Sequence, residues 1–203
     1  MCETFLRSGD ILSVPNYMWF ANYRIKQHEK AKRGSGGVGG GIHNWIVRLC
    51  NIEILDDTRD SVLWLKLKCK YNGTSLCICA CYLPPKSSVH AANAEAFFDD
   101  LETEIHHYQN EGSLCICGDF NARIGDTADF IEGVDELEPR CTVDYTENDF
   151  GDWLINHIIS TNMCVLNGRL GDTGQFSCIS QKGRSMVDYA FVPYEQLHFW
   201  KEF

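Results

Sequence analysis

The chain of 203 residues contains 44% hydrophobic and 12% aromatic side chains, enough for a buried core, which excludes a disordered protein. Its net charge of −10 argues against a passive nucleic-acid binder, but an enzyme that gathers carboxylates around a divalent cation remains possible. No apolar run approaches the roughly 20 residues of a membrane span, and the first residues lack a secretory pattern. We therefore expect an intracellular protein, nuclear or cytoplasmic, with no membrane partner.

Several short runs have the composition of β-strands, and two longer segments have the periodicity of helices. The Gly-rich stretch 34–41 matches neither pattern of a phosphate-binding loop, so it predicts a turn that enters a strand. Asn93 can cap a helix that ends near Gly112, and a second helix is expected from about Phe150 to Thr161. Two packed sheets with helices outside them follow from this pattern. The expected strands are residues 45–50, 62–69, 76–83, 114–117, 164–166, 176–179 and 186–192.

The cysteines are numerous, and their spacing indicates strands rather than cross-links. Cys77, Cys79 and Cys81 alternate along the sequence, as do Cys115 and Cys117. A period of two places each set on one face of a strand, where a thiol packs as a small apolar group. The spacing resembles no common zinc motif, so reduced core thiols are favoured over disulfides or a zinc site.

The segment Gly118-Asp119-Phe120-Asn121 follows the apolar run that ends at Cys117. If the backbone stays extended, Asp119 and Asn121 point to the same side and Phe120 points into the core. The carboxylate can orient or deprotonate a water, and the amide can donate to a phosphate oxygen as charge builds there. The alternative is an Asp/Asn turn that only closes the strand.

Further motifs occur in order along nearly the whole chain, and together with this signature they resemble the endonuclease/exonuclease/phosphatase superfamily. Within it, the pattern is most similar to the apurinic-endonuclease-like nuclease of non-LTR (LINE-type) retrotransposons. The resemblance implies a four-layer α/β sandwich of the deoxyribonuclease type, with two mainly antiparallel sheets flanked by helices. The motifs are Cys2-Glu3-Thr4, Gly34 to Val38, Tyr82-Leu83-Pro84-Pro85, Gly118 to Arg123 and Ser185-Met186-Val187-Asp188-Tyr189.

The resemblance also implies a role for five residues in the hydrolysis of a DNA phosphodiester. Glu3 would bind Mg²⁺ or Mn²⁺, a hard cation that favours carboxylate oxygen and retains waters. Asp119 would position or activate the attacking water, and Asn121 would hold the phosphate. Tyr82 would approach the scissile phosphate through its hydroxyl, and Asp188 would orient a catalytic histidine.

Two elements of the family pattern are absent from the sequence. A strand with an Asn precedes the Glu motif in the family, and a Ser-Asp-His segment supplies the catalytic histidine; neither occurs here. The histidines that are present, at positions 28, 43, 90, 106, 107, 157 and 198, fit that role poorly. We therefore expect residues 1–203 to form a single, incomplete domain without its first and last strands, a truncated copy or partial gene model with impaired activity.

Three functions follow from this pattern. The first is a metal-dependent phosphodiester hydrolase of the DNA endonuclease type, derived from a retroelement and needing no obligate protein partner. The second is a phosphoesterase of the same superfamily that acts on a substrate other than DNA. The third is a catalytically dead remnant or binding module that keeps the sheets without the chemistry.

Overall fold

The computed structural model describes residues 2–7, 10, 12–24, 34, 36–88, 93–169, 175–181 and 183–200. The chain forms two compact units. The first comprises Met1–Tyr82 with Glu111–Gly118, and the second comprises Leu83–Asn110 with Asp119–Phe203. Within the described part of the chain, no helix is long and apolar enough to cross a membrane.

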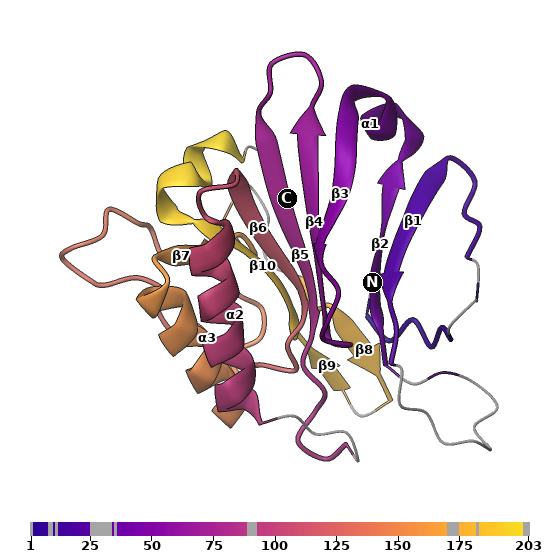
Figure 1. Cartoon of the computed structure of the whole chain (residues 1–203). Helices are drawn as coiled ribbons and strands as arrows, with labels where there is room; N and C mark the ends of the chain where they lie inside the picture. Colours follow the sequence, from indigo (N-terminus) through magenta and orange to yellow (C-terminus); the bar gives the residue numbers. More distant parts are fainter. Residues whose placement is uncertain are drawn as a thin grey trace. The chain divides into compact units, whose positions relative to one another are not determined.

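The first unit contains two β-sheets (Figure 1). Strand β1 (Tyr17–Asn22) pairs antiparallel with β2 (Val38–His43), and helix α1 (Asn44–Leu49) connects β2 to β3 (Cys50–Asp56). Strand β4 (Val62–Cys69) pairs antiparallel with β3 on one side and with β5 (Ser75–Tyr82) on the other. Strand β6 (Ser113–Asp119) follows β5 in the strand order.

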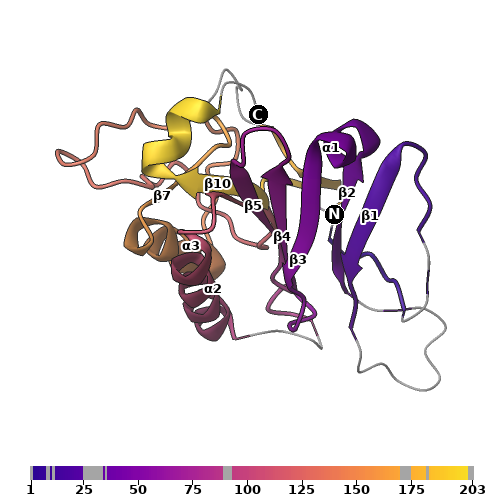
Figure 2. The same ribbon diagram turned by 45° about the horizontal axis from the view of Figure 1, so that its top comes forward.

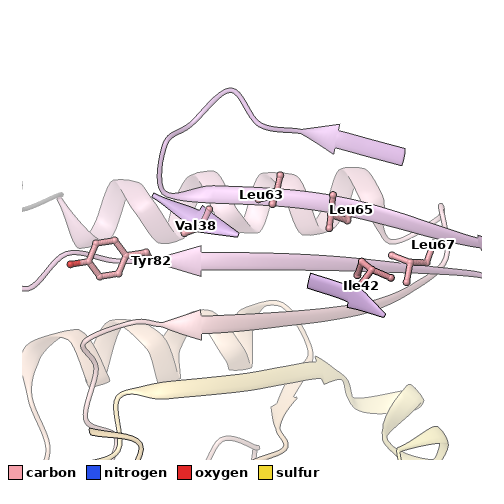
Figure 3. Close-up of a cluster of buried hydrophobic side chains, with 6 residues drawn as sticks. All are labelled: Val38, Ile42, Leu63, Leu65, Leu67 and Tyr82. Carbon is pink, nitrogen blue, oxygen red and sulfur yellow. The ribbon is translucent and has the colours of Figure 1, made fainter. Parts of the chain in front are cut away.

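The two sheets of this unit pack against each other through apolar side chains. Val38 and Ile42 of β2 and Leu63 and Leu65 of β4 belong to one buried cluster, which ends at Tyr82 on β5 (Figure 3). The Gly-rich stretch therefore leads into a buried strand, as predicted. On β5 the thiols of the alternating set are fully buried, and the structure, which describes all the cysteines, places none of them in a disulfide. These buried cysteines of β5 are Cys77, Cys79 and Cys81.

The prediction of a strand over residues 45–50 is wrong. Residues 45–49 lie in helix α1, and only Cys50 belongs to a strand, because β3 begins there. The ring Nδ1 of His43 accepts the Trp45 N–H at the helix start. Trp45 is 57% exposed, so its run of apolar side chains is not buried in a sheet. A six-residue apolar run fits a short helix as well as a strand, and here the cap at His43 decides between them.

The second unit contains two long helices. Helices α2 (Ala94–Tyr108) and α3 (Asp149–Ser160) contact each other (Figure 2). Both predicted helices are confirmed, and Asn93 caps α2 by accepting the Glu95 N–H at 3.1 Å. Helix α2 ends at Tyr108, one turn before the predicted Gly112.

The strands of the second unit are shorter. Strand β7 (Met163–Val165) pairs antiparallel with β10 (Asp188–Pro193), β8 (Cys178–Ser180) pairs with β9 (Gly183–Ser185), and a 3₁₀ helix η1 spans Tyr194–Phe199. The core of this unit is aromatic. The Phe120 ring lies 6.3 Å from that of Phe98 and 5.5 Å from that of Phe191, centroid to centroid. Phe120 is fully buried, so its predicted direction into the core is confirmed.

Candidate active site

In the first unit, the structure brings Glu3 and Tyr82 into contact. The Tyr82 hydroxyl donates to Glu3 Oε1 at 2.7 Å, although the two residues are 79 positions apart. Tyr82 lies at the carboxyl end of β5 (Figure 3) and is 6% exposed. Glu3, by contrast, is exposed. A buried ring thus holds one oxygen of a surface carboxylate in place.

The backbone around Glu3 is held by the Gly-rich stretch. The Thr4 N–H donates to the Gly37 carbonyl at 3.2 Å, and the Phe5 N–H donates to the Gly36 carbonyl at 3.0 Å. Glu3 itself has φ 52°, a left-handed conformation that costs a non-glycine residue about 1–2 kcal/mol. A Cβ on Gly37 would stand 2.6 Å from Thr4 Oγ1, so only glycine permits this close approach. The glycines therefore position the Glu-Thr motif.

In the second unit, Asp119 and Asn121 form a turn. Asn121 has φ 47°, and its backbone N–H donates to Asp119 Oδ1 at 2.9 Å. The prediction of an extended backbone is therefore wrong, and the alternative, an Asp/Asn turn, describes the local geometry. The Asn121 side-chain nitrogen donates to the Leu83 carbonyl at 2.9 Å. An amide nitrogen carries two N–H groups, so this bond still leaves one donor for a ligand.

Three of the sequence motifs meet at this turn through backbone hydrogen bonds. The Leu83 N–H donates to the Asp119 carbonyl at 2.9 Å, and the Phe120 N–H donates to the Val187 carbonyl at 3.0 Å. The segment that begins at Leu83, the signature from Asp119 onward and the link between β9 and β10 that contains Val187 are therefore adjacent within this unit.

Asp144 ties the signature to the Asp188 strand, and sequence reasoning missed it. Its carboxylate accepts from Arg123 Nε at 3.0 Å and Nη2 at 2.5 Å, and from the Met186 N–H at 2.9 Å. Burial alone would raise the pKa of Asp144, but the bonds from Arg123, Met186 and Thr146 outweigh it and hold this pKa below its usual range. Asp144 is therefore an ionised buried anchor. Nothing in its local sequence distinguishes it from other loop aspartates.

Asn148 is a second anchor that sequence reasoning missed. It caps α3 by accepting the Gly151 N–H at 2.8 Å, and it also accepts the Arg123 N–H at 2.9 Å and donates to the Asn121 carbonyl at 3.0 Å. An Asn just before an apolar-periodic segment is a recognisable helix cap. The cap could therefore have been predicted, but its bonds to the signature could not.

Asp188 begins β10 and is half-buried. Its backbone N–H donates to Ser177 Oγ at 3.1 Å, and its carbonyl accepts from Asn167 Nδ2 at 3.2 Å. Asn167 Oδ1 also accepts the Ala190 N–H at 2.9 Å. The position of Asp188 is thus fixed through its backbone by two polar side chains that the sequence analysis did not identify.

No histidine among the described residues has a recorded contact with Asp188. His43 caps α1, and His106 and His107 are exposed at the end of α2. His157 is buried in the aromatic core, where burial lowers its pKa to about 4. His198 lies in η1, and His28 and His90 fall outside the described residues.

The described residues contain no group of three or more His, Cys, Asp or Glu that could enclose a metal ion. This excludes, for that part of the chain, a closed site of the structural zinc type. A single carboxylate such as Glu3 fits Mg²⁺ better, because Mg²⁺ keeps several waters and binds through one or two carboxylates together with substrate phosphates.

Among solved structures, the chain is similar to the endonuclease domain of the telomere-specific non-LTR retrotransposon TRAS1, with 14% identity and a TM-score of 0.58 over 91% of this chain and 70% of that domain. It is also similar to the 3'-5' exonuclease NExo of Neisseria meningitidis, with 13% identity and a TM-score of 0.60 over 99% of this chain and 78% of that one.

A third similar structure is the AP endonuclease LMAP of Leishmania major, with 14% identity and a TM-score of 0.62 over 89% of this chain. The chain spans 63% of the length of LMAP. No family model and no curated protein sequence matches the chain. Likeness at this identity shows the fold alone: the chain has the deoxyribonuclease-like α/β architecture of these nucleases, which is the architecture that the motif resemblance predicted.

Proposed function

We propose that this chain is a metal-dependent phosphodiester hydrolase of the DNA endonuclease type, derived from a retroelement. The observation that carries the proposal is the hydrogen bond of 2.7 Å between Tyr82 and Glu3. The two residues belong to separate sequence motifs. Glu3 is exposed, so it does not need this contact to satisfy its carboxylate, which water could solvate instead. The TRAS1 endonuclease domain, which shares the fold, supports the choice of substrate and origin.

Each proposed residue has a defined task in this reaction. Asp119 positions and deprotonates the attacking water, and the second N–H of the Asn121 amide donates to a phosphate oxygen as negative charge develops there. The Tyr82 hydroxyl contacts the scissile phosphate and holds Glu3. The order of motifs along the chain supports assigning the Glu3–Tyr82 pair and the Asp119–Asn121 turn to the same reaction.

Glu3 is the proposed ligand of Mg²⁺ or Mn²⁺. When bound, the cation neutralises charge on the phosphate and on the leaving oxygen. Asp188 has the proposed task of orienting a histidine imidazole, as carboxylates do in hydrolase triads. Because the sequence contains no Ser-Asp-His segment, we expect these 203 residues to turn over slowly. The loss of a general acid/base group costs about 10²–10⁴-fold in rate.

The test is hydrolysis of supercoiled plasmid and of a duplex with one abasic site, with Mg²⁺ and with EDTA. We expect Mg²⁺-dependent nicking that falls by at least about 10²-fold in Asp119→Asn and Tyr82→Phe. Matched controls are Asp126→Asn and Tyr71→Phe, whose side chains are exposed and should leave the rate unchanged. Absence of nicking at every Mg²⁺ concentration, or full activity in Asp119→Asn, would overturn the proposal.

The two alternative functions predict different results. A dead remnant that keeps only the sheets has no metal site, so millimolar Mg²⁺ should leave its melting temperature unchanged. The proposed enzyme should be stabilised by Mg²⁺, and Glu3→Gln should abolish that shift. A phosphoesterase for another substrate should leave DNA intact but hydrolyse a member of a panel of inositol-phosphate, sphingomyelin and RNA-end substrates with the same Asp119 dependence.

A further inference from the structure

The side chain of Asn148 makes more contacts than a helix cap needs. Its Oδ1 accepts the N–H groups of Gly151, at 2.8 Å, and of Arg123, at 2.9 Å. Its Nδ2 donates to the Asn121 carbonyl at 3.0 Å, and its own backbone N–H donates to the Arg123 carbonyl at 3.1 Å. One side chain thus connects the first turn of α3 to two residues of the signature.

Capping α3 requires only an acceptor, which Ser, Thr or Asp would also supply. Of these residue types, Asn alone adds a strong amide donor, and Asn148 uses this donor on Asn121. Asn93, the cap of α2, shows the ordinary case, because its Oδ1 accepts the Glu95 N–H two residues later. The feature that distinguishes Asn148 is therefore its donation to the signature.

The bond to Asn121 acts on a conformation that needs support. Asn121 has φ 47°, in the left-handed region, and this conformation allows its N–H to meet Asp119 Oδ1 at 2.9 Å. The hydrogen bond that Asn148 donates to the Asn121 carbonyl fixes the peptide that follows Asn121. Asn148 also bonds to both the N–H and the carbonyl of Arg123, and these two bonds fix the next residues. The left-handed turn is therefore clamped from its carboxyl side.

Helix α3 stands directly against the same segment. A Cβ on Gly151 would lie 2.0 Å from the Arg123 carbonyl oxygen, so no side chain fits between the first helical turn and the signature. This contact is independent of the Asn148 hydrogen bonds. The start of α3 is thus a rigid support for the turn.

We propose that Asn148 is a positioning residue for the proposed phosphodiester site, because it holds Asn121 in the conformation that places the Asp119 carboxylate. This inference rests on the proposed function for its effect on turnover. The effect of Asn148 on the conformation of the Asp119–Asn121 turn, however, can be measured without any substrate.

The test uses Asn148→Asp, which is nearly isosteric, keeps the cap acceptor and replaces the donor with an oxygen that repels the Asn121 carbonyl. A carboxylate at a helix N-terminus is favourable, so we expect an unchanged or higher melting temperature. We expect kcat to fall by at least about tenfold with little change in KM, because misplacement of a reacting group costs turnover. Amide exchange of Asn121, followed by NMR, should accelerate by about tenfold or more while that of Leu154 in α3 stays unchanged.

The matched control is Asn93→Asp, which makes the same chemical change at the cap of α2 and should alter neither kcat nor Asn121 exchange. A purely structural role for Asn148 predicts that stability and activity fall together, and that result would overturn the proposal. Unchanged Asn121 exchange in a folded Asn148→Asp protein would also overturn it.

If the wild-type chain shows no hydrolysis, the proposed function fails, but the exchange measurement still decides the role of Asn148. If Asn148→Asp does not fold, Asn148→Ser keeps a cap acceptor, lacks the amide donor and is judged by the same readouts.

Discussion

Two buried polar side chains of the second unit, Asp144 and His157, differ in whether their surroundings stabilise the charged form. Asp144 is 6% exposed but receives hydrogen bonds from Arg123, Met186 and Thr146, so it stays ionised. His157 is 4% exposed, and neither of its ring nitrogens has a hydrogen-bond partner within the described chain. The Glu102 carboxylate lies 4.0 Å from its Nδ1, beyond hydrogen-bond distance, so burial remains the larger effect. Its ring packs near those of Phe98 and Phe191, at centroid distances of 5.3 and 6.1 Å. Ionisation is therefore supported at one position and opposed at the other.

His157 predicts an acid limit to stability. Burial, together with the nearby His106, lowers its folded pKa to about 4, below the ordinary value of 6.5, so the unfolded chain binds the proton more tightly. Its contribution is fully present above about pH 6.5 and is lost as the pH falls toward 4, by up to about 3 kcal/mol. We expect the free energy of unfolding, measured with urea, to fall less for His157→Leu than for the wild type between pH 7 and about 4.5. The exposed His107→Gln serves as control, and parallel curves for wild type and His157→Leu would contradict the prediction.

Among the elements, α3 combines a local preference for helix with a tertiary contact at its start. Its periodicity made it predictable. Of the side chains expected on its apolar side, Leu154 and Ile158 are buried, whereas Trp153 and Ile159 are exposed. Its start, however, is determined by the signature that it contacts. By contrast, residues 45–50 have a strand-like pattern, but residues 45–49 lie in α1, because a short apolar run does not distinguish a strand from a helix that lies at the surface.

Gly151→Ala should destabilise the protein, although alanine is the better helix former by about 1 kcal/mol. The added Cβ would meet the Arg123 carbonyl at 2.0 Å, and this contact cannot be relieved without moving the backbone. We expect a net loss of about 1–3 kcal/mol in the free energy of unfolding, measured by chemical denaturation. Asn156→Ala, at an exposed position of the same helix, should be stabilising by a few tenths of a kcal/mol. A gain in stability for Gly151→Ala would show that α3 can shift away from the signature.

Across the whole molecule, the cysteines report on both folding and oxidation state. The sequence contains 11 cysteines, and the structure places none of them in a disulfide. Cys141 and Cys178 are exposed, whereas Cys77 and Cys164 are buried. Burial raises the pKa of Cys77 and raises that of Cys164 to about 12, so their reactive thiolate forms are scarce at neutral pH.

Thiol titration of the native protein should therefore show a fast phase from Cys141 and Cys178 and a much slower phase from the buried thiols. The double variant Cys141→Ser/Cys178→Ser should lack the fast phase. Denaturation without reductant should make all 11 thiols reactive. A lower total would reveal disulfides, and fast reaction of Cys77 or Cys164 would contradict a closed core.

The sequence alone predicted the kind of fold that the structure has, and it indicated the chemistry that we propose. Apolar periodicity identified α2, α3 and most of the long strands, because burial imposes a period of two or 3.6 on a chain. The spaced motifs selected Glu3, Tyr82, Asp119, Asn121 and Asp188, because a phosphodiester site needs carboxylates, an amide and a hydroxyl in a recognisable order.

Only the tertiary structure decided how these residues are held. The contact between Tyr82 and Glu3 spans 79 positions. At the left-handed Asn121, the side-chain amide donates to the Leu83 carbonyl and the backbone carbonyl accepts from Asn148. Asp144 shows the same limit, because its role comes from Arg123 and Met186, which lie far from it in sequence. Local sequence encodes periodicity and residue type, whereas a hydrogen bond between distant segments exists only once the sheets and helices have packed.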